Sequence, residues 1–185
     1  MPNFVYIATS LDGFIAREDG GLDWLPQVEA AGEGGSGEDF GYADFLSGID
    51  AIIMGRHSIE VILSFGAWPY TLPVIVLSTT MKSAPNHLKG KVEIYKGPIE
   101  TLLKRLHSEG KTNLYIDGGK TIQSFLEEDL IDEMIITTIP VLLGDGIPLF
   151  GTTPQDIPFV HKGTEAYGNG MVKSHYVRKR EDATE

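Results

Sequence analysis

The stretch LYIDGG, residues 114–119, decides how we expect this chain to fold. Its first three residues are apolar and favour a buried strand, whereas Asp117 and the two glycines end that strand. A helix-like run then begins at Lys120. Glycines allow the backbone to approach a ligand closely, and the free N–H groups of a helix N-terminus favour a phosphate. The stretch therefore predicts a core strand that leads directly into a phosphate-binding helix.

Alternating strand and helix patterns extend on both sides of this stretch. Short apolar runs predict buried strands, and apolar residues at helical spacing predict the helices between them. Residues 11–24 carry Asp-Gly turn signals and are expected to form a loop. We expect strands at 3–9, 51–54, 73–78, 92–95, 113–116, 132–139, 157–166 and 171–178, and helices at 42–49, 56–63, 99–110 and 120–128.

This alternation predicts the fold class and the domain organisation. Strands that alternate with helices form a mainly parallel sheet covered on both faces. The turn at residues 168–170, Gly-Asn-Gly, suits an antiparallel hairpin. We therefore expect an α/β fold with three α-β-α layers, a mixed but mainly parallel central sheet and an antiparallel C-terminal hairpin. Residues 1–180 are expected to form a single domain, and residues 181–185 a polar tail.

Composition excludes several classes of function. The 185 residues carry a net charge of −11, so a nucleic acid would be repelled over most of the surface. No apolar run approaches the ~20 residues that span a bilayer, and the first residues lack the basic start of a signal peptide. We therefore expect a cytoplasmic protein without membrane contact. Cys is absent and the five His residues show no metal-ligand spacing, so we expect neither disulfides nor a metal.

Three strand ends carry residues that suit phosphates. Gly55 ends one strand, and the following run 56–58, Arg-His-Ser, combines a guanidinium with the start of a helix. Residues 77–80, Leu-Ser-Thr-Thr, place three hydroxyls at a second strand end, and residues 117–121 form the third. Ligands of open α/β sheets bind beyond the carboxyl ends of the strands, so these groups predict a dinucleotide lying across the sheet. No G-x-G-x-x-G fingerprint occurs near the first strand, and a Walker A motif is missing as well.

Several of these motifs occur in the order found in one known family. The stretches are IATSLDGFIA, DAIIMGRHSIE, VIVLSTT, LYIDGGKTIQSFL and DEMIITTIPVLLGDGIPLF, which lie between residue 4 and about residue 150. On these motifs the chain resembles the dihydrofolate reductase-like superfamily. Within it, the chain is similar to the reductase domain of the bacterial bifunctional riboflavin-pathway deaminase-reductase. A deaminase zinc domain is missing from this sequence.

The resemblance implies an NADPH-dependent reductase. It places the backbone of Ala8 at the nicotinamide carboxamide, and Ser78 and Thr79 at the 2′-phosphate that distinguishes NADPH from NADH. It also implies that the Gly118–Gly119 link, often a cis peptide in the family, leaves room for a phosphate that a Cβ atom would push away. The residues assigned to the cofactor are Ala8, Ile15, Ala16, Gly55, Arg56, His57, Ser58, Leu77, Ser78, Thr79, Asp117, Gly118, Gly119, Lys120, Thr121 and Ile122.

The resemblance also implies a carboxylate that helps to protonate the substrate. Asp39 has the corresponding spacing, with Glu29, Glu38 and Asp44 as alternatives; Asp39 could instead be a helix N-cap. The substrate side is otherwise assigned to Trp24, Tyr42, Ile62 and Thr137. Trp24 could instead fill the core, and Thr137 could simply pack within the sheet.

These assignments lead to one main hypothesis and two rivals. The main hypothesis is hydride transfer from NADPH to a C=N or C=O carbon of a small heterocycle or sugar-amine. A ribose 5-phosphate on the substrate would need basic residues, and Arg17, Lys162 and Lys173 are the candidates. The first rival is an NADP(H)-binding protein without turnover, with a sensor or structural role. The second is a homodimer whose interface is the main feature, because residues 140–150 are rich in apolar side chains.

Overall fold

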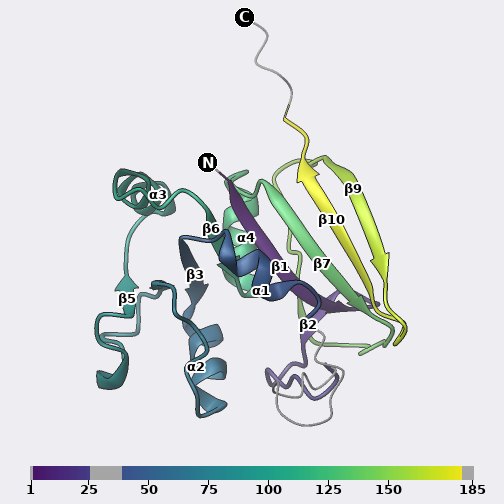
Figure 1. Ribbon diagram of the computed structural model, residues 1–185, viewed down its shortest axis with the longest axis horizontal. Coiled ribbons are helices and arrows are strands. Elements are labelled where there is room, and N and C mark those ends of the chain that lie inside the picture. Colours follow the sequence, from purple (N-terminus) through teal and green to yellow (C-terminus); the bar gives the residue numbers. More distant parts are fainter. Residues whose placement is uncertain (1, 26–38, 181–185) are drawn as a thin grey trace, which may run out of the picture.

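The protein folds around a sheet of eight strands. The computed structural model describes residues 2–25 and 39–180 (Figure 1). The strands of this sheet lie in the order β5-β4-β3-β6-β1-β7-β10-β9. In chain order their bounds are β1 Asn3–Ser10, β3 Ala51–Gly55, β4 Val74–Leu77, β5 Val92–Tyr95, β6 Leu114–Asp117, β7 Glu133–Ile139, β9 Phe159–Ala166 and β10 Val172–Arg178.

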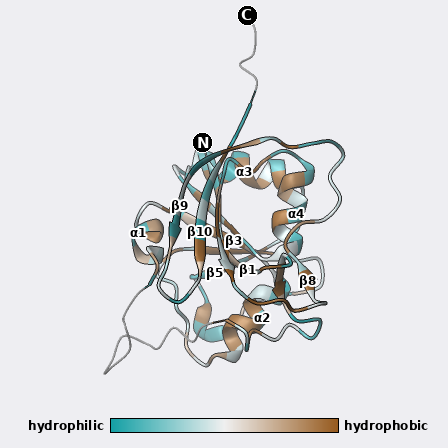
Figure 2. Ribbon diagram, turned by 90° about the vertical axis from the view of Figure 1, so that its right-hand side faces the viewer, coloured by the Kyte–Doolittle hydropathy of each residue, from teal (hydrophilic) through white to brown (hydrophobic). Residues whose placement is uncertain are grey.

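Helices cover both faces of the sheet and so create two hydrophobic cores. Their bounds are α1 Tyr42–Ser47, α2 Arg56–Ser64, α3 Ile99–Ser108 and α4 Gly119–Glu127, with a 3-10 turn at Asn86–Leu88. Figure 2 shows α1 on one side of the sheet and α3 and α4 on the other. One core joins α3 and α4 to the sheet around Leu102, Ile116 and Phe125, all fully buried. The other joins α1 and α2 around Ile52, Met54 and Ile59.

The sheet is parallel except at its C-terminal edge. Strands β5, β4, β3, β6, β1 and β7 all run in the same direction. Strand β10 runs antiparallel to β7 and to β9, with Lys173 opposite Thr137 on β7. The predicted three-layer fold, mainly parallel sheet and antiparallel hairpin are therefore confirmed. Because parallel strands share one carboxyl edge, the residues that follow β1, β3, β4 and β6 gather at the same edge.

Part of the segment expected to be a loop forms a small two-stranded ribbon instead. Strand β2, Phe14–Ala16, pairs with β8, Ile147–Pro148, in antiparallel fashion. Gly146 has a φ of 158°, and a Cβ atom there would lie 2.3 Å from the carbonyl oxygen of Ala16, so this approach requires glycine. A three-residue strand is too short to show a period in the sequence, and its partner lies about 130 residues away.

Asp12 fastens this ribbon to the end of the sheet. Its carboxylate accepts hydrogen bonds from the amides of Leu143, at 3.1 Å, and Gly144, at 2.8 Å, and from the Ser10 hydroxyl, at 2.6 Å. The Ser10 hydroxyl is the main cause that lowers the pKa of Asp12, so the group is ionised at neutral pH. These bonds join the stretches SLDG, residues 10–13, and LLGDG, residues 142–146, which lie far apart in the sequence. Within the described ranges, no helix has the length and apolar composition needed to cross a membrane.

Asp50 offers a direct test of how β3 is held to β6. Its Oδ2 atom accepts hydrogen bonds from the backbone amides of Thr112 and Asn113, both at 2.8 Å. We expect Asp50→Ala to lower the free energy of unfolding by about 1–2 kcal/mol at pH 7, measured by urea denaturation, because two amides lose their acceptor. Asp156→Ala is the matched control, since this exposed carboxylate makes no side-chain hydrogen bond within the described residues.

The contribution of Asp50 is also expected to depend on pH. The amides of Asn113 and Thr112 lower the pKa of the folded carboxylate below its ordinary value. The stabilisation is therefore present above the unfolded pKa of about 4 and is lost as the pH falls through the folded pKa. The gap in stability between the wild-type protein and Asp50→Ala should narrow on acidification. A gap that stays constant from pH 7 to pH 3 would contradict this account.

Candidate functional site

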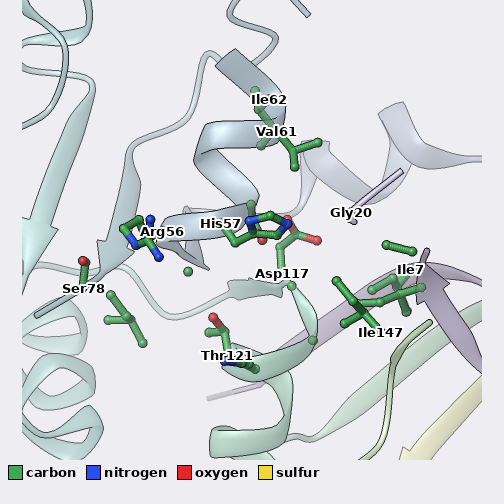
Figure 3. A pocket seen from close by; sticks show the side chains of 18 of the residues that line it. Ile7, Gly20, Arg56, His57, Val61, Ile62, Ser78, Asp117, Thr121 and Ile147 are labelled. Carbon is green, nitrogen blue, oxygen red and sulfur yellow. The ribbon is translucent and has the colours of Figure 1, made fainter. Parts of the chain in front are cut away.

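A cavity of about 960 Å³ opens at the carboxyl edge of the parallel strands. It is lined by the ends of β1, β3, β4 and β6, by the first turns of α2 and α4, and by the β2–β8 ribbon. Figure 3 shows Arg56 and Ser78 towards one end of the cavity, Ile7 and Ile147 towards the other, and Asp117 between them. The volume lies at the upper end of the ~300–1,000 Å³ typical of ligand and cofactor sites.

Two helix N-termini face this cavity without a side-chain cap. Helix α2 begins after Gly55, and α4 begins after Gly118; neither N-cap residue offers a side chain that could accept a hydrogen bond from the helix. The first N–H groups of a helix have no partner within the helix, and they carry a partial positive charge. The amides of residues 56–58 and 119–121 are thus placed to donate to an anion in the cavity.

The glycines between β6 and α4 are explained by protein packing. Gly118 has a φ of 88°, and a Cβ atom there would lie 2.2 Å from the Oγ atom of Ser58 on α2. A Cβ atom on Gly119 would lie 2.9 Å from the Cδ1 atom of Ile15 on β2. The Gly118–Gly119 peptide is trans. The missing side chains thus make room for Ser58 and Ile15, although both glycines also line the cavity. This differs from the expectation that a phosphate fills the space.

Polar groups at the end nearest β4 are available for an anionic ligand. The Ser78 hydroxyl oxygen accepts hydrogen bonds from the amides of Thr80, at 3.2 Å, and Met81, at 2.9 Å, so its own hydrogen can still be donated. Arg56 pairs with Glu60 through one nitrogen, at 2.8 Å, and its side chain is 51% exposed, which leaves other N–H groups free to bind. The lining cations Lys96 and Lys120 lie at the end of β5 and the start of α4.

The structure brings nearly all residues assigned to the cofactor into one cavity. Ile122 is the exception, because it is fully buried in the core between α4 and the sheet. The assigned residues that line the cavity are Ala8, Ile15, Ala16, Gly55, Arg56, His57, Ser58, Leu77, Ser78, Thr79, Asp117, Gly118, Gly119, Lys120 and Thr121.

Asp39 lies outside the cavity. Its carboxylate is exposed and accepts hydrogen bonds from the amides of Ala43, at 2.8 Å, and Gly41, at 3.0 Å, as a helix-capping residue does. These bonds, with Ala43 first, lower the pKa of Asp39, which disfavours proton donation. Of the alternatives, Asp44 is exposed on α1 and does not line the cavity, whereas Glu29 and Glu38 lie outside the described residues.

The residues assigned to the substrate side lie in different places. Ile62, on α2, lines the cavity. Tyr42, on α1, does not line it but packs against Tyr6, with 5.4 Å between ring centroids. Trp24 and Thr137 also lie outside the lining; Thr137 is buried in β7 beside Ala8, as the packing interpretation expected.

Asp117 is a carboxyl group that does line the cavity, and tyrosines surround it. The Tyr115 hydroxyl donates to the carbonyl of Tyr6, at 2.9 Å, and to the Oδ1 atom of Asp117, at 3.3 Å. Burial is the main cause that raises the pKa of Asp117, and burial likewise raises the pKa of Tyr42 to about 12 and that of Tyr70 further. This part of the site therefore favours uncharged groups or a ligand that stabilises the Asp117 carboxylate.

The sequence offered little sign of these tyrosines. Tyr6 and Tyr115 lie on β1 and β6, Tyr42 on α1, and Tyr70 in the segment after α2, so only the fold brings them together. Leu22, Leu25, Val61, Phe65 and Ile147 also line the cavity and were not assigned from the sequence. The position of Asp117 directly after an apolar strand was the one available signal.

Comparisons with known proteins agree with this architecture. A family model described as the RibD C-terminal domain matches residues 4–173. YwjB, an uncharacterized protein of Bacillus subtilis strain 168, is 40% identical over 176 residues, covering 94% of this chain and 96% of YwjB. A crystal structure of a Shewanella sp. PV-4 protein named for riboflavin biosynthesis matches with a TM-score of 0.88 and 43% identity, over 97% of this chain and 100% of that one.

A more distant structure shows the same fold. Dihydrofolate reductase from Enterococcus faecalis, complexed with NADP(H), matches with a TM-score of 0.65 and 15% identity over 97% of each chain. This match shows that the chain has the dihydrofolate reductase-like fold, and the family model confirms the resemblance to the riboflavin-pathway reductase domain.

The contact between Gly118 and Ser58 can be tested by substitution. We expect Gly118→Ala to lower the free energy of unfolding by about 2 kcal/mol or more, measured by chemical denaturation, because of both the clash and the positive φ. Adding Ser58→Ala should restore only part of the loss, since the backbone strain persists. Gly163→Ala is the control, because a Cβ atom there would meet nothing within 4 Å. Equal stability of Gly118→Ala and the wild-type protein would contradict the packing account.

Proposed function

The chain belongs to the RibD C-terminal domain family, and on that premise we propose that it is an NADPH-dependent reductase. Its substrate would be a small heterocyclic or sugar-amine compound, reduced at a C=N or C=O bond. The observation that supports this proposal most directly is the pair of uncapped helix N-termini on one cavity. A dinucleotide carries two linked phosphates, and two helix N-termini can bind them from opposite sides.

The residues present fit such a cofactor. The amides at the starts of α2 and α4 would hold the pyrophosphate, and the Arg56 guanidinium with the hydroxyls of Ser78 and Thr79 would hold the adenosine 2′-phosphate. At the other end, Ile7, Ala8 and Ile147 form an apolar wall that suits the nicotinamide ring (Figure 3). The cations among the lining residues lie at the phosphate end, which suits the charge distribution of NADPH.

The protein would contribute orientation, exclusion of water and a proton. NADPH, when bound, supplies a hydride, so the acceptor carbon gains one hydrogen and its nitrogen or oxygen gains a proton. The apolar wall would keep water from the reacting carbon, and the fixed strand ends would hold donor and acceptor in line. Asp117 is better placed than Asp39 to hold the proton, because it lines the cavity and its burial raises its pKa.

A fluorescence titration of NADPH against NADH tests the cofactor assignment. We expect the wild-type protein to bind NADPH about tenfold or more tightly than NADH, because one charge-assisted hydrogen bond contributes about 1.5–3 kcal/mol. Arg56→Ala and Ser78→Ala should each weaken NADPH binding and reduce this preference. Lys104→Ala is the matched control, since Lys104 pairs with Glu100 on α3, away from the cavity.

Two other outcomes would change the conclusion. Equal and weak binding of both nucleotides would leave only the fold and would overturn the cofactor assignment. Tight binding of NADPH without its oxidation by any of a panel of imines, pterins, pyrimidines and carbonyl compounds would favour the rival function, an NADP(H)-binding protein without turnover.

We also propose that the chain forms a homodimer. Leu11 and Leu142 are 62% and 67% exposed, and they lie near each other because the Leu11 amide donates to the Val141 carbonyl at 2.8 Å. Light scattering at two concentrations should give the mass of two chains, and Leu142→Asp should shift it towards one chain by placing a charge in the interface. The mass of a single chain at both concentrations would contradict this proposal.

A further inference from the structure

The cavity has two ends that differ in charge. The Lys, Arg and His residues among its described lining are Arg56, His57, Lys96 and Lys120, which come from α2, the end of β5 and α4. Between this charged end and the apolar wall of Ile7 and Ile147 lies a second part, which we call the tyrosine end and which contains Tyr6, Val61, Ile62, Tyr70, Tyr115 and Asp117. Figure 3 shows His57 next to Asp117, with Val61 and Ile62 above both and Ser78 at the far left. A ligand in the tyrosine end therefore meets rings, aliphatic groups and one carboxyl.

Asp117 has no cationic partner in the described part of the chain. Its side chain accepts a hydrogen bond from the Tyr115 hydroxyl, at 3.3 Å, and forms no ion pair with the described Lys, Arg or His residues. Ionisation of a partly buried carboxyl group is unfavourable when no positive charge lies next to it. A ligand with a basic nitrogen next to Asp117 would share the proton of the carboxyl group. The positive charge on that nitrogen would then stabilise the carboxylate.

The basic residues considered for a substrate phosphate are engaged elsewhere. Arg17 pairs with Asp23 at 2.7 Å, and Lys173 pairs with Glu165 at 3.0 Å while donating to the carbonyl of Phe40 at 2.8 Å. Lys162 lies on β9 and does not line the cavity.

The two longer segments outside the described ranges add no Lys or Arg side chain. Residues 26–38 and 181–185 contain neither Lys nor Arg in their sequence. The lining cations and the helix N-termini are those already assigned to the cofactor phosphates, so a second phosphate next to Asp117 and the aromatic rings would lack a counter-charge of its own, which is costly in a partly buried site.

From these observations we infer that the substrate is a planar, phosphate-free heterocycle with a weakly basic C=N nitrogen, and that Asp117 binds and protonates this nitrogen. The inference rests on the proposed reductase function and narrows its substrate. The faces of Tyr6 and Tyr70 would contact the ring, and they also suit the positive charge that forms on it.

The proposed step balances in atoms and electrons. A hydride from NADPH forms the new C–H bond, and the π electron pair of the C=N bond moves to nitrogen. That nitrogen takes the proton of Asp117 and becomes N–H, and NADP⁺ is the oxidised product. Solvent returns a proton to the Asp117 carboxylate before the next turnover.

The test uses two small probes on the full chain saturated with NADP⁺, so that the phosphate end is blocked. The probes are 3,4-dihydroisoquinoline, a planar cyclic imine, and ribose 5-phosphate, and their binding is measured by calorimetry. We expect the imine to bind at least about tenfold more tightly than ribose 5-phosphate. Asp117→Asn should weaken imine binding about tenfold or more, because the amide cannot share a proton with the base, whereas Asp156→Asn should leave it unchanged.

Three further measurements distinguish a folding defect from a defect in binding or catalysis. Asp117→Asn should keep its affinity for NADP⁺ within about twofold, which shows that the cavity is intact. Tyr70→Leu, which removes one ring, should weaken imine binding and leave NADP⁺ binding unchanged. Wild-type protein mixed with NADPH and the imine should oxidise NADPH, and Asp117→Asn should do so at least about tenfold more slowly.

The results of these experiments can contradict the substrate inference and the proposed reductase function independently of each other. Ribose 5-phosphate binding as tightly as the imine, or imine binding that is indifferent to Asp117→Asn, would overturn the substrate inference even if NADP⁺ binds well. Absence of NADP⁺ binding with Asp117-dependent imine binding would instead overturn the reductase proposal and leave the recognition by Asp117 standing.

Discussion

The site depends on how closely the turn between β6 and α4 approaches helix α2. Gly118 lacks a side chain and has a positive φ, so Ser58 can lie against the turn at a distance that no other residue at position 118 would allow. This contact places two helix N-termini on one cavity. Because neither helix has a side-chain cap, the amides of both first turns are left for a ligand. A parallel sheet makes the arrangement possible, since its strands all end at the same edge.

The distribution of charge then divides this cavity by function. The chain is strongly acidic overall, with a net charge of −11, yet Arg56, Lys96 and Lys120 gather at the end where the helices begin. Between this end and the apolar wall, Asp117 lies among tyrosines (Figure 3). One cavity can therefore suit a polyanionic cofactor and a neutral or weakly basic ring at the same time, because the two ligands meet opposite electrostatic environments.

Much of the fold can be predicted from local patterns in the sequence, because these patterns reflect which side chains are buried and where the backbone turns. Runs such as AIIM and VIVL lie in the middle of the sheet and are buried on both faces, so their apolar character is continuous and easy to identify. The strand ends near Gly55, Leu77 and Asp117 can be predicted for the same reason, and most of the residues that we assign to the cofactor follow from them. The ribbon of β2 and β8 was missed, because three residues show no period and the pairing is long-range.

The substrate end shows where such reasoning fails. Asp39 has the spacing of a catalytic carboxylate, but its oxygens cap the segment that leads into α1, and a spacing cannot show what a side chain binds. The group around Asp117 draws on Tyr6, Tyr70 and Tyr115, which are far apart in the sequence. The glycines after Asp117 are predicted from the sequence to make room for a phosphate, whereas in the structure they make room for Ser58 and Ile15.

A crystal structure of the protein grown with NADP⁺ tests the central claim most directly. The account predicts that the pyrophosphate lies between the N-termini of α2 and α4, accepting hydrogen bonds from amides of residues 56–58 and 119–121, with the 2′-phosphate next to Arg56 and Ser78. Density for NADP⁺ elsewhere on the protein, or a saturated crystal in which these amides contact only water, would contradict it.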